Sequence, residues 1–296
     1  MTPISLLKKV PGTLPTPHLR GECAHCESSR HLFQQAAIAT FVARACSALL
    51  VVLLATSVIA QDSSAEAKTA YADAANFQNN GAFDLAEEEW QKFLKDFPKD
   101  PLAPKARHYL GVCLMQQKKY PEAVAAFDAV QKENPKFELL EDTLLNLGYS
   151  QYQLAANDKA MYPKAAETLN ALMDKFPKGK FADQALYFLG EANYHQGKKP
   201  EAIAAYDRLA KEQPKSELRD DALYALGVAQ EELGKYPEAG AAYDLFLKDY
   251  DKHELATEVR MRKAETVLQA GDFANAEKTF GEVAAVKNFP LADHDA

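Results

Sequence analysis

The residues near the amino terminus include a set that could bind zinc. Two imidazoles and two thiols occur within one short segment, at His18, Cys23, Cys26 and His31. Such a set can hold Zn²⁺ in a small folded domain. However, residues 1–35 contain four prolines and two glycines and show no helical periodicity. Attachment of c-type haem is excluded because Glu27, and not a histidine, follows Cys26. We therefore expect a disordered leader, or an over-called start site, with no metal.

The rest of the chain lacks the residue combinations that catalysis requires. After residue 60 there is no GxSxG motif, no HExxH motif, no glycine-rich phosphate loop and no CxxC pair. His108 and Cys113 lie five residues apart, which separates them by about 140° around a helix, so they do not face each other. We expect Cys113 to be a small buried residue. The sequence therefore predicts a protein that is not an enzyme and needs no cofactor.

Composition narrows the class further. The chain has 296 residues, of which 47% are hydrophobic and 26% charged, so it can bury a sizeable core. Its net charge is −8, and residues 1–60 contain five basic and two acidic side chains, so the remainder has a net charge of −11. Nucleic-acid binding requires clustered Lys and Arg, and we expect no nucleic-acid partner.

A sixteen-residue apolar run without charge occupies residues 45–60 and follows Arg44. A basic flank, a short apolar stretch and small residues at its end are typical of a secretory signal. Val58 and Ala60 stand at the −3 and −1 positions of a cleavage site, so a mature chain would begin at Gln61. Extending the run back to Ala36 reaches the length of a membrane-spanning helix, about 20 residues, but includes Arg44. Residues 37–60 are thus predicted to be a signal peptide or a membrane anchor.

Beyond a linker at 61–66, the chain repeats one unit six times. A small residue marks each copy, at Ala74, Gly111, Gly148, Gly190, Gly227 and Ala264. The steps between them are 37, 37, 42, 37 and 37 residues, and the long step contains five extra residues near 155–160. A fixed period of this length predicts a solenoid of stacked repeats.

Each position of the unit has a structural role. The small residue follows a leucine in four copies and is expected midway along a first helix, where only a small side chain allows the next helix to approach. Four prolines suit the first turn of a second helix, namely Pro121, Pro163, Pro200 and Pro237. Another four should end that helix, namely Pro98, Pro135, Pro177 and Pro214. Because no segment alternates as a strand would, the pattern predicts an all-α fold of helix-turn-helix units.

This pattern resembles the tetratricopeptide repeat (TPR) family over residues 68–285, and its period and Leu-Gly and Tyr-Pro-Glu-Ala style resemble bacterial periplasmic members. Those include the Tol–Pal-associated cell-division coordinator and the outer-membrane assembly lipoprotein BamD. The resemblance implies a right-handed solenoid of six TPR-like repeats over residues 67–287. Residues 288–296 form a tail that resembles the start of a further repeat. The resemblance also implies a periplasmic or cell-envelope location and a protein partner.

In the resembled family, partners contact fixed positions of the first helices. Transferred to this chain, those positions produce a run of tyrosines, at Tyr149, Tyr152, Tyr187, Tyr194 and Tyr224. Acidic residues flank the run, at Glu191, Asp221, Glu231, Glu258 and Glu265. Tyrosine is enriched at interfaces because it combines a large rigid contact area with a polar tip. We hypothesise an aromatic groove with an acidic rim, including Glu191 and Glu231, that accepts an extended or helical segment of another protein.

Three alternatives remain open at this level. The tyrosines could pack between repeats with only their hydroxyl groups exposed to water, since tyrosine is often buried in this way. Aromatic stacking on a cell-wall polysaccharide would leave the same residues. If residues 37–60 are retained as an anchor, the chain would instead be a membrane-anchored assembly factor.

Overall fold

The structure is a computed structural model that describes residues 62–284. The chain divides into two units, residues 1–61 and residues 62–296. The predicted zinc-type residues, the leader at 1–36, the signal or anchor at 37–60 and the tail at 288–296 all lie outside the described residues. Among the residues that are described, no helix is long and apolar enough to cross a membrane.

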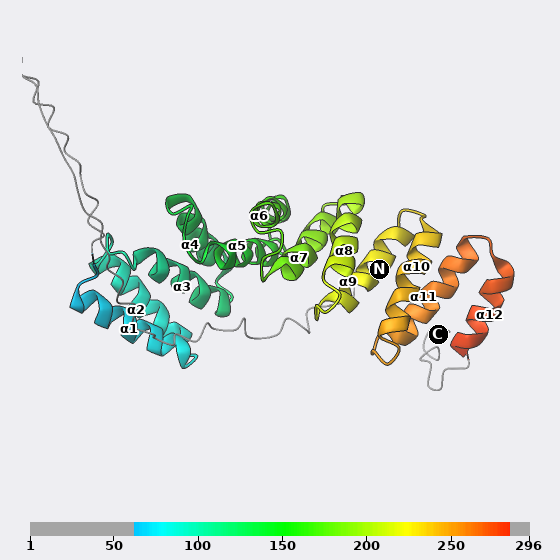
Figure 1. The fold of residues 1–296 in the computed structure, drawn as a ribbon, viewed down its shortest axis with the longest axis horizontal. Helices are drawn as coiled ribbons and strands as arrows, with labels where there is room; N and C mark the ends of the chain where they lie inside the picture. The colour runs from blue at the N-terminus through cyan, green and yellow to red at the C-terminus, as the bar shows by residue number, and fades with distance from the viewer. Residues whose placement is uncertain (1–61, 285–296) are drawn as a thin grey trace, which may run out of the picture. The chain divides into compact units, whose positions relative to one another are not determined.

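Residues 62–284 form twelve helices and no strand (Figure 1). The first helices of the six repeats are α1 (Ala65–Asn79), α3 (Ala103–Gln116), α5 (Leu140–Leu154), α7 (Ala182–His195), α9 (Arg219–Glu231) and α11 (Ala256–Gln269). The second helices are α2 (Phe83–Asp96), α4 (Tyr120–Glu133), α6 (Met161–Lys175), α8 (Lys199–Glu212), α10 (Tyr236–Asp249) and α12 (Phe273–Ala284). Each helix packs on the next along the chain, and the first helices α3, α5 and α7 also contact one another in order. The prediction of an all-α solenoid of about six repeats is confirmed.

The helix ends follow from local sequence. The first helix begins at Ala65, inside the segment predicted as a linker, because the Ser64 hydroxyl accepts a hydrogen bond from the Ala67 amide (3.1 Å) and caps the helix. Proline stands in the first turn of α4, α8 and α10, as predicted. The second helices end before the later prolines, and the residue preceding each proline leaves the helical region, as Phe97 does with φ −128° and ψ 52°. The five extra residues of the third copy lengthen the turn between α5 and α6.

In five of the six repeats the turn between the two helices contains one residue with positive φ. Glycine fills this place in four copies, at Gly81, Gly197, Gly234 and Gly271. In the second copy the place belongs to Lys118, with φ 62°. A Cβ atom makes this left-handed conformation costly, by roughly 1–2 kcal/mol. Two backbone hydrogen bonds close the end of α3 and stabilise this conformation of Lys118. They run from Lys118 N to Met115 O (2.9 Å) and from Lys119 N to Leu114 O (2.9 Å).

The small residue of each first helix receives a large side chain of the second helix. A methyl group on Gly190 would lie 2.3 Å from the Tyr206 ring, and one on Gly227 would lie 2.2 Å from the Tyr243 ring. Phe127 lies against Gly111 in the same way, and Leu169 lies against Gly148. The expectation that only a small residue allows this approach is confirmed.

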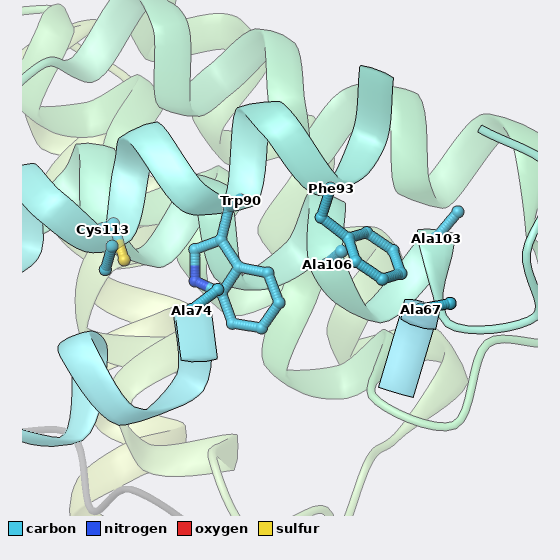
Figure 2. Packing of buried hydrophobic residues seen from close by; sticks show 8 residues of the cluster. Ala67, Ala74, Trp90, Phe93, Ala103, Ala106 and Cys113 are labelled. Atoms are coloured by element: carbon cyan, nitrogen blue, oxygen red, sulfur yellow. The ribbon is translucent and has the colours of Figure 1, made fainter. Parts of the chain in front are cut away.

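The first repeat, α1 and α2, shares with α3 a core around Trp90 (Figure 2). Trp90 is fully buried and donates from Nε1 to Oε1 of Gln78 on α1 (2.9 Å). Cys113 lies in the same core, as predicted, with Sγ 3.4 Å from that Gln78 oxygen. Burial raises the pKa of the Cys113 thiol to about 12, so the thiol stays protonated and unreactive.

Candidate functional site

The seven predicted site residues lie on three successive first helices, α5, α7 and α9. Tyr149 and Tyr152 are on α5. Tyr187, Glu191 and Tyr194 are on α7, and Tyr224 and Glu231 are on α9. The fold therefore brings residues that are far apart in the sequence onto consecutive elements, and α5 and α7 are in direct contact.

These tyrosines differ in exposure. Tyr187 is 7% exposed and Tyr224 is 8% exposed, so both are packed between helices. The Tyr187 ring lies against Phe188 and Tyr206, with ring centroids 5.5 and 6.4 Å apart. Tyr187 and Tyr224 therefore pack between helices, which was the alternative to a binding role. Tyr149, Tyr152 and Tyr194 are only partly buried. These three are therefore the more accessible tyrosines of the run.

Glu191 is the centre of the polar contacts on α7. Its carboxylate accepts a hydrogen bond from the Tyr152 hydroxyl of α5 (3.1 Å) and another from the Tyr206 hydroxyl of α8 (2.6 Å). Its side chain is 15% exposed, and Nε2 of His195 lies 4.0 Å from Oε2. Glu191 thus links three helices of two adjacent repeats through neutral donors.

Rings surround this carboxylate. Phe188 packs against Tyr149 (5.0 Å between centroids) and against Tyr152 (5.6 Å). His195 stacks on Tyr162 of α6, with centroids 4.9 Å apart and planes inclined by 16°. The result is an aromatic cluster at the junction of the third and fourth repeats, with one carboxylate in it.

A second group of contacts joins the fourth, fifth and sixth repeats. The Tyr194 hydroxyl donates to Glu232 (2.7 Å), which also pairs with Lys199 (2.9 Å). The Tyr224 hydroxyl donates to Glu258 of α11 (2.5 Å). Tyr194 and Tyr224 therefore each donate a hydrogen bond to a carboxylate of the next repeat.

Glu231 has a different environment from Glu191. It accepts from the Tyr243 hydroxyl (2.8 Å) and from Nη1 of Arg262 (3.0 Å), and Nε of Arg262 also bonds Glu258 (3.1 Å). The Arg262 guanidinium lies over the Tyr224 ring at 5.5 Å. Burial raises the pKa of Glu231 despite these partners. Arg262 therefore holds α9 and α11 together.

Burial sets the proton states of the tyrosines. It raises the pKa of Tyr149 to about 12, and it raises the pKa values of Tyr152, Tyr187 and Tyr194 as well, with the nearby carboxylates adding to the shift in these three. The phenols are therefore neutral donors at physiological pH. No group of three or more His, Cys, Asp or Glu side chains within residues 62–284 is arranged to hold a metal ion.

Sequence reasoning missed several members of these networks. The hydroxyl bonds of Tyr206 to Glu191 and of Tyr243 to Glu231 were not foreseen. Arg262 and Glu232 were not singled out at all. A signal was present for the tyrosines, because a phenol in a buried stripe needs an acceptor and a glutamate recurs on the facing helix.

Comparisons with known proteins agree with this architecture. One model of the tetratricopeptide repeat family matches residues 71–136 and 151–217, and a second matches residues 221–253. Together they cover more than half of the chain. A search of curated proteins finds no match.

Solved structures share the fold at low identity. A tetratricopeptide repeat protein from Parabacteroides merdae matches with a TM-score of 0.54 and 18% identity, over 74% of this chain and 78% of that one. MamA, residues 41 to the end, from Desulfovibrio magneticus matches with a TM-score of 0.54 and 18% identity, over 64% of this chain and 98% of that one. Another MamA structure matches with a TM-score of 0.51 and 21% identity, over 62% and 90%. At these identities the likeness concerns the fold.

Proposed function

Because the chain belongs to the tetratricopeptide repeat family, we propose that it is a non-enzymatic scaffold that binds a segment of another protein along its first helices. Members of this family are generally interaction scaffolds without catalytic activity. A fold does not define a function by itself, so the proposal depends on the site.

One observation supports the site most directly. Tyr149, Tyr152 and Tyr194 are partly exposed on adjacent first helices, and their rings are held in place by packing and hydrogen bonds. A preorganised aromatic side chain loses little conformational entropy when a partner binds. Tyr187 and Tyr224 are buried, which differs from the equal roles expected from the sequence.

We also propose that the scaffold acts in the cell envelope, outside the cytoplasm. The support is the apolar run at 45–60 with Arg44 before it, and the single thiol after residue 60, which fits an exported chain that folds without cross-links. Sequencing the amino terminus of the protein from cells tests this. A chain beginning at Gln61 supports cleavage and export, whereas a retained segment 37–60 in a membrane fraction supports an anchor.

Photo-crosslinking in the native cell tests the scaffold proposal. The photoreactive residue is placed at Tyr194, which is partly exposed, and in a control variant at Glu201, which is exposed on α8. We expect one dominant protein to be captured from Tyr194 and not from Glu201. The absence of any protein adduct from a folded, abundant chain would overturn the proposal in favour of a polysaccharide ligand.

A further inference from the structure

We propose that the segment bound along α5, α7 and α9 is cationic, a stretch of another protein rich in Lys and Arg. This inference rests on the proposed function and specifies the chemistry of the partner. It follows from three features of the described residues: the distribution of charge among the helices, the use of the tyrosine protons, and the surroundings of Glu191.

Among the six first helices, net negative charge is largest on α5, α7 and α9. The first helices α5, α7 and α9 together contain seven acidic residues and one basic residue. That basic residue, Arg219, is 8% exposed and pairs with Asp249 of α10 (2.7 Å). The second helices of the same repeats, α6, α8 and α10, contain six basic and eight acidic residues. The first helices on either side, α3 and α11, have a net positive charge. The acidic face therefore does not simply reflect the overall acidity of the protein.

Three tyrosines of this face already use their hydroxyl hydrogen in a hydrogen bond. Tyr152, Tyr194 and Tyr224 donate to Glu191, Glu232 and Glu258, respectively. Their free hydrogen-bonding capacity consists of oxygen lone pairs, and their other contact surface is the ring, whose face is electron-rich. Acceptors and ring faces both attract donors and cations. An acidic segment would find neither a free phenol proton on these three residues nor an accessible Lys or Arg on α5, α7 or α9.

Glu191 lacks a cationic partner within residues 62–284. Its bonds come from two phenols, and the nearest basic group is the His195 imidazole at 4.0 Å. The carboxylate is bonded to Tyr152 and lies 4.0 Å from His195, two members of the aromatic cluster formed by Tyr149, Tyr152, Tyr162, Phe188 and His195. A Lys or Arg side chain of a partner that enters this cluster would gain a charge pair and ring contacts together.

Peptide binding to the purified full-length chain tests the proposal. The probe is a fluorescein-labelled twelve-residue peptide with four lysines, and the comparison peptide has glutamates in their place. The face variant removes three carboxylates on and beside this face, with Glu191→Gln on α7, Glu232→Gln directly after α9 and Glu265→Gln on α11 near Glu231. The matched control removes the same charge from the exposed second-helix surface, with Glu167→Gln, Glu201→Gln and Glu238→Gln. Circular dichroism and thermal melting verify that both variants are folded.

We expect the lysine peptide to bind and the glutamate peptide not to bind. The face variant should weaken lysine-peptide binding by at least about tenfold, while the control changes it by less than about twofold. Equal weakening in both variants, or no binding of the lysine peptide at low salt, would overturn the inference. The two proposals fail separately: a crosslinked partner whose captured segment is not enriched in Lys and Arg contradicts the cationic inference and leaves the scaffold function intact.

Discussion

The contact between Gly190 and Tyr206 leads to a sharp prediction about two chemically identical substitutions. A methyl group at Gly190 would lie 2.3, 2.6 and 2.8 Å from three carbons of the Tyr206 ring. That ring is 1% exposed and its hydroxyl is bound to Glu191 at 2.6 Å, so it cannot move without breaking other contacts. Gly240 lies in the interior of α10, where a methyl group would meet only the Thr266 hydroxyl, at 3.6 Å.

The two variants should therefore shift stability in opposite directions. Replacing glycine by alanine inside a helix stabilises it by about 1 kcal/mol, and this gain applies to both positions. Overpacking a closed core costs about 1–3 kcal/mol, and three such short contacts place Gly190→Ala near the upper end. The expected result is a loss of about 2 kcal/mol for Gly190→Ala and a gain of about 1 kcal/mol for Gly240→Ala. Ala74 and Ala264 are buried at the equivalent position of the outer repeats, so the helix pair can adapt and the loss stays limited.

Urea denaturation followed by circular dichroism measures both changes. For an array of this length, each kcal/mol corresponds to about 2–4 °C in melting temperature. The mechanism is isolated by a third and a fourth variant, Tyr206→Ala alone and combined with Gly190→Ala. Once the ring is absent, Gly190→Ala should become stabilising. Equal stabilisation by Gly190→Ala and Gly240→Ala in the wild-type background would refute the reasoning.

Three further predictions concern a turn, a buried histidine and the tyrosine run. Lys118→Gly should raise the free energy of unfolding by about 1 kcal/mol, because it removes the strain of φ 62°; no gain in a melting experiment would contradict this. His108 is buried, and its Nδ1 lies 2.9 Å from the Thr143 hydroxyl. Burial lowers the pKa of His108 to about 4, from about 6.5 in the unfolded chain. Between these two pH values only the unfolded state takes up a proton. The contribution of His108 to stability should fall by about 2 kcal/mol from pH 7.5 to pH 5, and His108→Phe should remove this dependence in urea titrations; an unchanged pH slope would count against it. Tyr187→Ala should cost about 3 kcal/mol or more and Tyr194→Ala less than about 1 kcal/mol, since only Tyr187 is buried, and equal melting shifts would contradict the assignment of Tyr187 to packing.

Much of the fold could be predicted because its determinants are local. Proline in a first turn, a positive-φ residue in the turn and a small residue facing a large one all act within a single repeat of about 37 residues. Ser64 began the first helix two residues before the predicted repeat boundary, since the capping hydroxyl acts independently of the repeat pattern. Repetition of the same pattern six times then defined the array.

The burial of the predicted site residues could not be predicted as well as the fold. Tyr187 and Tyr194 lie seven residues apart on α7 and so nearly on the same side of the helix, yet Tyr187 is buried and Tyr194 is partly exposed. The Tyr187 ring packs against Phe188 and Tyr206 of its own repeat, whereas the Tyr194 hydroxyl reaches Glu232 of the next repeat. The acceptors of their protons also lie far along the chain, since Tyr152 and Glu191 are 39 residues apart.

The sequence by itself determined the all-α repeat architecture, the positions of the turns and the need for a small residue midway along each first helix, because each depends on residues within one unit. Only the tertiary structure decided which tyrosines are buried, which carboxylates accept hydrogen bonds from their hydroxyl groups and which helices form an acidic face. Those properties depend on contacts between units, where the rigid stacking of one helix pair on the next determines what each side chain meets.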